Sequence, residues 1–370
     1  MWSVVHQFVP TLHLGDAIGD HVVRIQARQR ARGRVSEIFV DVERDETAHL
    51  THPMTELDDR IDKGSTLLMY HVAQASRCAE FLLNRPEPLA LQFHNFTPVD
   101  LLVGWDASAA CDMLEAGRQL RDLASVATIG ISDSHHNAEV LTDHGVEHSR
   151  VAIIPVQVSH ETVPRLVTQT APSQTAPSQI VLFVGRVAPN KAFHDLIACA
   201  AVLRHSIPNV QFRLVGGETS ETYSRALRQL TRSLDLESTV TFTGRVSDKD
   251  LAAEYLNADI FCSLSDHEGF GVPLLEAMAR ALPVVAFDSS AVGETVGYGG
   301  LILTDKSPTT VAAALERVLT DPALAEHLSS AGLARAASFT AERSDTEFET
   351  AFAEAWGLFQ GSAPSTGAPA

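Results

Sequence analysis

The sequence has few cysteines, no long apolar run and a deficit of basic residues. Its four cysteines are scattered through 370 residues without a CxxC pair or a zinc-ligand spacing, which argues against a disulfide framework and a zinc ribbon. No stretch of 18 apolar residues occurs, so we expect no membrane span. Residues 1–8 lack the basic and apolar regions of a signal peptide. We therefore expect a cytoplasmic protein with reduced thiols.

Positive charge is scarce in both halves of the chain. The sequence has 28 Lys and Arg against 46 Asp and Glu, a net charge of −18. Residues 1–165 contain 14 of the basic and 23 of the acidic residues, so each half carries −9. Neither half has the excess of basic residues that binds a phosphate backbone, and we expect no nucleic-acid partner. The mean hydropathy of +0.03 and the 45% hydrophobic content indicate a folded globular chain, long enough for two domains.

The first half of the chain alternates between short apolar strands and helix-forming stretches. Residues 4–9 read as a buried strand, followed by a polar turn at 15–20 and a helical stretch that ends near Gly33. Strand, turn, helix and strand form the repeating unit of a parallel sheet. Further strands are predicted at 38–40, 66–71, 89–93, 128–132 and 151–155.

A second series of the same kind follows an interruption. Residues 170–174 and 175–179 repeat the letters TAPSQ, a composition that is typical of a linker or an exposed loop. Apolar residues then recur every fourth position over 345–359, which predicts a terminal amphipathic helix. Strands of the second series are predicted at 180–185, 211–215, 239–242, 260–264, 284–287 and 301–303.

The fold class predicted from this pattern is α/β, with two doubly wound Rossmann-like domains. Ligands of such domains bind beyond the carboxyl ends of the strands, so a central cleft between the domains is the expected site. The predicted segments are an N-terminal Rossmann-like domain at 1–165, a linker at 166–179, a second Rossmann-like domain at 180–342, a helix at 343–360 and a disordered tail at 361–370.

The most informative stretch is 265–279, with the sequence SDHEGFGVPLLEAMA. It follows a predicted strand, and Pro273 suits the first position of a helix. Gly269 and Gly271, just before that helix, allow backbone N–H groups to approach an anion where the helix dipole is positive. Glu276 is placed in the first turn and suits the hydroxyls of a ribose, while Glu268 suits those of a sugar. The alternative is a glycine turn with a glutamate favoured by the helix dipole.

A pair of cations follows the first strand of the second series. Arg186 and Lys191 lie five residues apart in the sequence GRVAPNK. Exposed basic side chains are usually only solvated, and that alternative stays open for the pair taken alone. At the carboxyl end of a strand they would face the same cleft as Gly269 and Gly271, where they would stabilise a departing diphosphate.

Together these motifs resemble the retaining glycosyltransferases of family 4 (glycosyl transferases group 1), which have the GT-B fold. The resemblance is carried by the Arg–Lys pair, by EGFG with a glutamate eight residues after the first, by VGG at 215–217 and by FTGRVS at 242–247. It is strong over 180–340 and looser before that. Three departures from the family pattern are Ala192, where glycine is common, the loop at 15–19, which lacks the frequent double glycine, and residues 289–294, where SSAVGE replaces a glycine-rich turn.

The resemblance implies that the domain at 1–165 binds the acceptor and the domain at 180–342 binds the nucleotide sugar. It also implies roles for individual residues. Arg186 and Lys191 would hold the diphosphate, Glu276 the ribose, and Val246 would lie beside the base. Glu268 would hold the donor sugar together with the backbone of Gly269, Phe270, Gly271 and Val272. In the N-terminal half, Gly15 would approach the phosphates and His94 would lie near the anomeric carbon. His94, Arg186, Lys191 and Glu268 are the predicted catalytic set.

The resemblance also implies a reaction: retaining transfer of a hexose from a UDP-, GDP- or other nucleotide diphosphate sugar to a hydroxyl. The expected reaction needs no metal or other cofactor. The acceptor is a glycan, a lipid-linked sugar or a small molecule, and we expect a role in surface glycan or glycoconjugate synthesis by a monomer or homodimer. The alternatives are a non-catalytic nucleotide-sugar-binding protein and a sugar-nucleotide epimerase of the same fold.

Arginines gather on and after the first predicted helix. Arg24, Arg28 and Arg32 would allow weak peripheral contact with an anionic membrane, at the inner face. The more ordinary interpretation is a solvated helix face whose arginines pair with Glu37, Asp41 and Glu43.

Overall fold

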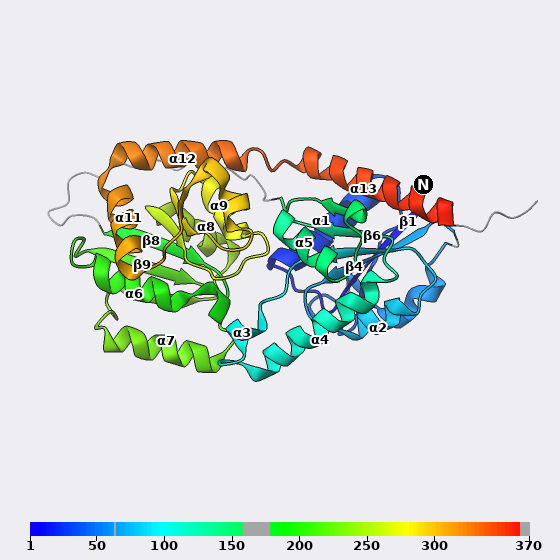
Figure 1. Ribbon diagram of the computed structural model, residues 1–370, viewed down its shortest axis with the longest axis horizontal. Coiled ribbons are helices and arrows are strands. Elements are labelled where there is room, and N and C mark those ends of the chain that lie inside the picture. The colour runs from blue at the N-terminus through cyan, green and yellow to red at the C-terminus, as the bar shows by residue number, and fades with distance from the viewer. Residues whose placement is uncertain (63, 158–177, 363–370) are drawn as a thin grey trace, which may run out of the picture. The chain divides into compact units, whose positions relative to one another are not determined.

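The computed structural model describes residues 1–62, 64–157 and 178–362. They group into two compact units (Figure 1). Unit 1 comprises Met1–Phe96, Cys111–Val156 and the described part of Ala341–Ala370, and unit 2 comprises Thr97–Ala110 and the described part of Gln157–Thr340. Each unit is built on one parallel sheet, as the sequence predicted. Most of the predicted linker, and the tail from residue 363, lie outside the described residues.

Unit 1 contains a seven-stranded parallel sheet in the order β3-β2-β1-β4-β5-β6-β7. Its long central strands are buried along their whole length, which explains their nearly continuous apolar sequences. The three-residue β3 escaped prediction because it is short and ends in a proline, a residue that suits an edge strand. The strands are β1 (Val4–Val9), β2 (Ile38–Val40), β3 (Thr51–Pro53), β4 (Thr66–Val72), β5 (Leu89–Phe93), β6 (Ile129–Ser132) and β7 (Val151–Ile153).

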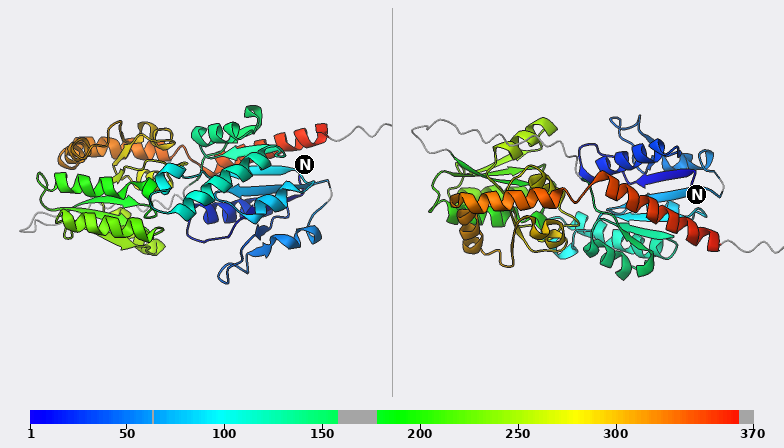
Figure 2. Two further views of the ribbon diagram at one scale, coloured as in Figure 1. Left: turned by 60° about the horizontal axis from the view of Figure 1, so that its bottom comes forward. Right: turned by 90° about the horizontal axis from the view of Figure 1, so that it is seen from above.

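Helices cover both faces of this sheet (Figures 1 and 2). One core contains Ile25 of α1 and Phe348 and Phe352 of α13, packed on sheet residues that include Met69. A second core, on the opposite face, joins η1, α2, α4 and α5 to the sheet. The elements are α1 (Ala17–Ala31), η1 (Met54–Asp59), α2 (Arg77–Leu83), α4 (Ala107–Ala124), α5 (His135–Asp143), η2 (His148–Arg150) and α13 (Ala341–Ser362).

Unit 2 contains a six-stranded parallel sheet in the order β10-β9-β8-β11-β12-β13. All six strands coincide with predicted ones to within two residues at either end. They are β8 (Gln179–Val184), β9 (Val210–Val215), β10 (Val240–Gly244), β11 (Ile260–Ser263), β12 (Val284–Phe287) and β13 (Leu301–Leu303). The helices are α3 (Val99–Leu102), η3 (Pro189–Lys191), α6 (Phe193–Leu203), α7 (Glu221–Ser233), α8 (Asp248–Asn257), α9 (Val272–Ala279), α10 (Val292–Val296), η4 (Gly297–Gly299), α11 (Pro308–Thr320) and α12 (Pro322–Ala336).

Two segments group differently from the predicted domain boundaries. Residues 97–110 belong to unit 2, where the Trp105 ring packs edge-on against Tyr223 at 5.0 Å and the Trp105 carbonyl accepts a hydrogen bond from Ser220. The terminal helix α13 belongs to unit 1 and runs two residues beyond its predicted bounds at either end. Its apolar face completes a core of unit 1, because Phe352 is buried there and its carbonyl accepts a hydrogen bond from the Trp2 indole at 2.8 Å.

Candidate active site

Three turns at the carboxyl ends of β8, β9 and β10 are joined through their backbones. Gly185 donates to the Val215 carbonyl at 2.9 Å, and Gly216 donates to the Gly244 carbonyl at 3.0 Å. The turns approach so closely that a Cβ on Gly216 would lie 1.8 Å from the Gly185 carbonyl oxygen, and its φ of +153° is one that few other residues adopt. We call this edge of the unit 2 sheet, with the turns that follow β8, β9, β10 and β11, the carboxyl rim.

The two predicted cations follow β8 on the carboxyl rim. Arg186 is exposed, and no partner for its guanidinium is found among the described residues. Lys191 ends the 3-10 turn η3, which is followed by Ala192 at a φ of +49°. Ala192 thus occupies a left-handed conformation that costs little only for glycine, which gives a physical reason for the glycine common at this position in the family.

Lys191 and Glu268 form an ion pair in unit 2. The lysine Nζ lies 2.7 Å from both carboxylate oxygens, with 16% of one side chain and 11% of the other exposed. The two loops are also joined by backbone, because Asp266 donates to the Asn190 carbonyl at 2.8 Å. Their direct pairing was not predicted from the sequence, in which Lys191 was expected to hold the diphosphate and Glu268 the donor sugar.

The loop before α9 adopts the backbone that its glycines predict. Gly271 is the N-cap of α9 at a φ of +90°, where a Cβ would also lie 2.8 Å from Leu274. Phe270 is buried against Phe339, so only its backbone is available to a ligand. Val272 opens the helix, and half-buried Gly269 precedes Phe270. The backbone N–H groups at this helix start can receive an anion.

Glu276 lies in the second turn of α9, not the first. The helix begins at Val272 because Gly271 is the cap, which places Glu276 at the fifth position. Its carboxylate accepts a hydrogen bond from the buried Tyr255 hydroxyl at 2.8 Å. Burial raises the pKa of Tyr255, as does the neighbouring Glu276 carboxylate, so this hydroxyl keeps its proton and remains a donor. The Arg280 guanidinium stacks 4.7 Å from the Tyr255 ring centre.

Val246 lies in the turn between β10 and α8. It is half-buried, directly before Ser247, whose side chain caps α8 by accepting from the Asp250 backbone. Within unit 2, the carboxyl rim therefore collects nine predicted site residues: Arg186, Lys191, Val246, Glu268, Gly269, Phe270, Gly271, Val272 and Glu276.

Lys306 is a charged residue of unit 2 that was not predicted as part of the site. This lysine follows β13, lies 2.7 Å from Asp195 and also pairs with Asp266 of the loop that carries Glu268. Burial alone would lower the pKa of Lys306, but the two carboxylates raise it above its usual value. No motif marked Lys306, because its partners come from α6 and from the loop after β11.

The two remaining predicted site residues, Gly15 and His94, belong to unit 1. Gly15 has a φ of +75° and donates its N–H to Asp20 of α1 at 3.0 Å. The glycine with the least space in this turn is Gly19, where a Cβ would lie 1.7 Å from the His13 carbonyl oxygen. The missing double glycine therefore leaves a turn that is still held by close backbone packing.

His94 directly follows β5 and contacts two further histidines. Its Nε2 lies 2.9 Å from Nδ1 of His71, and its ring is edge-on to that of His21 at 5.7 Å. Burial lowers the pKa of His94 to about 4, so the ring is neutral near pH 7. His71 and His21 were not predicted, although a histidine near the carboxyl end of a buried strand was the signal that found His94.

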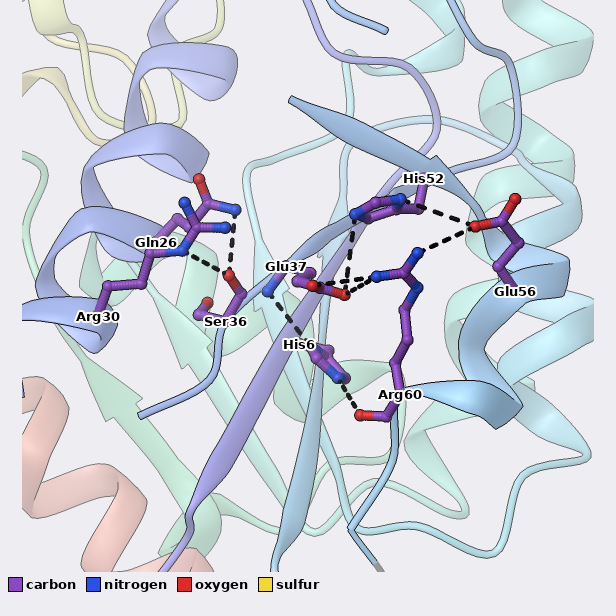
Figure 3. Close-up of polar contacts among 8 residues, drawn as sticks. All are labelled: His6, Gln26, Arg30, Ser36, Glu37, His52, Glu56 and Arg60. Atoms are coloured by element: carbon purple, nitrogen blue, oxygen red, sulfur yellow. Dashed lines mark hydrogen bonds and ion pairs between the residues drawn. The ribbon is translucent and has the colours of Figure 1, made fainter. Parts of the chain in front are cut away.

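The arginines of α1 pair with α13 rather than with the expected partners. Arg28 lies 2.9 Å from Asp345 and Arg32 lies 3.2 Å from Glu349. Glu37 instead faces Arg60 and His52 (Figure 3), and Asp41 pairs with Arg77. The same close-up shows Arg30 and Gln26 donating to the Ser36 carbonyl, so these contacts are local to unit 1.

The described residues contain neither a cluster of metal ligands nor a helix suited to a membrane span. Over 1–62, 64–157 and 178–362, no three His, Cys, Asp or Glu side chains are grouped as a metal ion would require. In the same ranges, none of the helices is both long enough and apolar enough to cross a bilayer.

Comparison with solved structures defines the fold. Sucrose-phosphate synthase from Thermosynechococcus elongatus superposes with a TM-score of 0.74 at 20% identity, covering 97% of this chain and all of that one. HepE from Anabaena, solved in complex with UDP and glucose, gives a TM-score of 0.73 at 17% identity over 94% of this chain and 99% of that one. The chain therefore has the GT-B fold, as its sequence predicted.

Comparison of sequences gives the family. Residues 170–335 match the family Glycosyl transferases group 1. A D-inositol 3-phosphate glycosyltransferase from Kineococcus radiotolerans is 32% identical over 221 residues, which is 54% of this chain and 51% of that protein. The chain thus spans about half the length of this relative. The region from 170 to 335 belongs to the glycosyl transferases of group 1.

Proposed function

We propose that the protein is a glycosyltransferase that moves a hexose from a nucleotide diphosphate sugar to a hydroxyl acceptor. The observation that carries the proposal is the composition of the carboxyl rim in the region that matches group 1. An exposed cation, an ion pair of Lys191 with Glu268, a helix N-terminus and the Tyr255-bound Glu276 all follow strand ends of one sheet. These are the groups that a diphosphate, a sugar and a ribose require.

The proposed roles follow the charge of each group. Arg186 and Lys191 bind the diphosphate, with the backbone at the start of α9 adding N–H donors. The Glu276 carboxylate accepts from ribose hydroxyls, and Val246 packs beside the base. Glu268 accepts from hydroxyls of the donor sugar, with the backbone of Gly269, Phe270, Gly271 and Val272. Gly15 and His94 contribute from unit 1.

The proposed reaction is a front-side displacement with retention of anomeric configuration. The bond from the anomeric carbon to the diphosphate oxygen breaks, and its electron pair leaves with the diphosphate. The acceptor oxygen bonds to the anomeric carbon from the same face, and its proton passes to the departing diphosphate oxygen. Arg186, Lys191 and the α9 N-terminus stabilise the negative charge that develops, so the proposed step uses no metal.

The proposed setting is the synthesis of a surface glycan or glycoconjugate in the cytoplasm. The relative with 32% identity is named for transfer to an inositol phosphate, and HepE was solved with UDP and glucose, which support hydroxyl acceptors and nucleotide donors as classes. The proposed acceptor is a glycan, a lipid-linked sugar or a small molecule, and the proposed enzyme is a monomer or a homodimer. Because Arg28 and Arg32 pair with Asp345 and Glu349, we do not extend the proposal to membrane contact.

Thermal unfolding with UDP, GDP, ADP and dTDP tests the donor site. A nucleotide at 100 times its dissociation constant stabilises the native state by about 2.7 kcal/mol. We expect one base to give the largest shift, Glu276→Ala to abolish it, and Glu221→Ala on the exposed face of α7 to keep it. No shift with any of the four in folded protein contradicts the proposal.

Turnover separates the transferase from its alternatives. The donor sugars of the best-bound nucleotide are incubated with acceptor mixtures of glycans and inositol phosphates. A transferase releases nucleoside diphosphate in an acceptor-dependent reaction, while an epimerase changes the sugar without release. A binding protein shows the thermal shift but neither reaction.

A further inference from the structure

Polar side chains form a row across three adjacent strands of unit 1. Gln7 of β1, His71 of β4 and His94 just after β5 are connected in that order, and Gln7 and His71 are fully buried. His71 Nε2 lies 2.9 Å from the Gln7 Oε1, and His71 Nδ1 lies 2.9 Å from His94 Nε2. Burying such groups is costly unless each hydrogen bond is made, so the positions of the protons follow from the contacts.

The first proton is fixed by Gln7. Its amide nitrogen donates to the Val22 carbonyl at 3.1 Å, which places the amide oxygen toward His71. The reverse orientation would bring two oxygens together at Val22. Because the Gln7 oxygen can only accept, His71 Nε2 carries a hydrogen.

The second proton follows from the neutrality of His71. The titratable groups that act on this ring are His94 and His21, and His21 in turn faces Arg24 and Arg28. None of them is a carboxylate, and burial lowers the pKa of His71 well below its usual value. A neutral ring with Nε2–H has a bare Nδ1, so the hydrogen between the two histidines belongs to His94 Nε2.

The remaining nitrogen of His94 is then a lone pair. From the residues that the structure describes, Nδ1 of His94 receives no hydrogen bond, and it is not one of the buried atoms that lack a partner. The His94 side chain is half-buried, unlike those of Gln7 and His71, and its Nδ1 lone pair can accept a hydrogen bond but not donate one.

We propose that Gln7 and His71 are positioning residues that hold His94 as the Nε2–H tautomer. In this tautomer the His94 Nδ1 accepts a hydrogen bond from a sugar hydroxyl and does not bind a sugar carboxylate. The inference rests on the proposed function for the role of His94 beside the donor sugar. The Nε2–H tautomer of His94 therefore selects neutral hexoses over uronic acids. A carboxylate would require a proton on Nδ1 as well, and burial, which lowers the pKa of His94 to about 4, opposes this second proton near pH 7.

His6 shows what a purely structural histidine looks like in the same sheet. Its Nδ1 accepts from the Glu37 backbone at 3.2 Å and its Nε2 lies 2.9 Å from the Arg60 carbonyl (Figure 3). Both nitrogens are satisfied by backbone, so the ring offers nothing to a ligand. A substitution at His6 is therefore a control for the loss of a buried histidine of unit 1.

The tautomer is measured directly by nitrogen NMR of the full chain labelled in histidine, with the His94 signal identified by its loss in His94→Ala. Between pH 6 and 8 we expect Nδ1 in the unprotonated range and Nε2 in the protonated range. His71→Asn supplies a carbonyl oxygen in place of Nδ1 and is expected to keep this pattern, as is His6→Asn. His71→Leu is expected to give an average of the two tautomers.

Wild-type protein with Nδ1 protonated, or with the two nitrogens averaged, overturns the inference. A spectrum unchanged by His71→Leu overturns the role of His71. Because these spectra are recorded without a donor, they test the tautomer independently of the proposed transferase activity. Full turnover by His94→Ala would instead contradict the proposed role of His94 beside the sugar. The tautomer assigned to His94 in the wild-type protein would still hold.

Kinetics test the consequence for the substrate. His71→Leu is expected to lower kcat about tenfold with little change in the donor KM, and His71→Asn to recover most of it, since one hydrogen bond is lost and regained. A uronic acid donor of the same nucleotide is expected to have a kcat/KM about 10- to 100-fold below that of the hexose. Equal use of the two donors overturns the selection of neutral hexoses.

Discussion

Lys191 holds Glu268 through both carboxylate oxygens, each 2.7 Å from its ammonium nitrogen. Both side chains are mostly buried, so either charge would be poorly solvated without the other. The pair fixes a cation and a carboxylate on the carboxyl rim before any ligand arrives. A diphosphate that binds Lys191 must therefore do so while the lysine also pairs with Glu268.

The Lys191–Glu268 pair predicts a non-additive pattern of stability. Lys191→Met and Glu268→Gln each leave a charged partner unsatisfied and are expected to lower the free energy of unfolding by about 1–3 kcal/mol. The double variant is expected to recover much of that loss, because no unpaired charge remains, yet to stay inactive. Urea unfolding of the four proteins measures the coupling. Additive losses would contradict a direct pair.

Gly216 predicts that a single methyl group disrupts the carboxyl rim. In Gly216→Ala the new Cβ would lie 1.8 Å from the Gly185 carbonyl oxygen, so the turn before Arg186 must move. We expect a loss of about 1–3 kcal/mol in unfolding free energy and weaker nucleotide binding. Gly217→Ala is the control, because its Cβ would meet only the Arg245 side chain at 3.8 Å and should change stability by less than about 0.5 kcal/mol. Equal behaviour of the two variants in thermal shift assays would refute the argument.

Much of the fold could be predicted because strands of a parallel sheet are buried on both faces. Six apolar runs in the first half and six in the second predicted strands that the structure contains. The four-residue spacing of Phe348 and Phe352 likewise predicted a helix, which is α13. The short β3 carried too few residues for a periodic signal. The grouping of α13 with unit 1 could not be predicted, since periodicity shows that a face is apolar and not what it packs against.

The sequence predicted which residues belong to the candidate site better than it predicted the contacts among them. The glycines at 269 and 271 indicated the loop, yet the position of Glu276 depended on where α9 begins, which Gly271 determines. Lys306 and His71 were missed because their partners are far apart in the chain. Residue types at strand ends show which groups are available, but ion pairs and proton positions require the folded distances.

The histidines of unit 1 predict a loss of stability in mild acid. Burial lowers the pKa of His94 to about 4 and that of His71 well below its usual value, whereas the unfolded chain titrates near 6.5. Between these values the unfolded state binds more protons, so stability is full above about pH 6.5 and falls as the pH drops. Each such histidine contributes about 1.4 kcal/mol per pH unit.

Comparison with a variant isolates this contribution from that of the carboxylates. His71→Asn removes one titrating ring, so its unfolding free energy should fall less steeply than that of wild type from about pH 6 to pH 4.5. Urea midpoints in matched buffers give both slopes. Parallel slopes would mean that His71 is not neutral in the native state or titrates normally there.

The terminal helix α13 predicts where unit 1 is most sensitive to truncation of a side chain. Phe352 is 1% exposed in a core shared with α1 and the sheet, and its carbonyl accepts the Trp2 indole hydrogen. Phe352→Ala is expected to lower the free energy of unfolding by about 3–5 kcal/mol, through lost burial and the cavity left behind. Leu358→Ala on the same helix removes a side chain that is 38% exposed, and should cost less than about 0.5 kcal/mol. Equal losses in chemical unfolding would show that α13 packs on unit 1 through a different face than the one bearing Phe352.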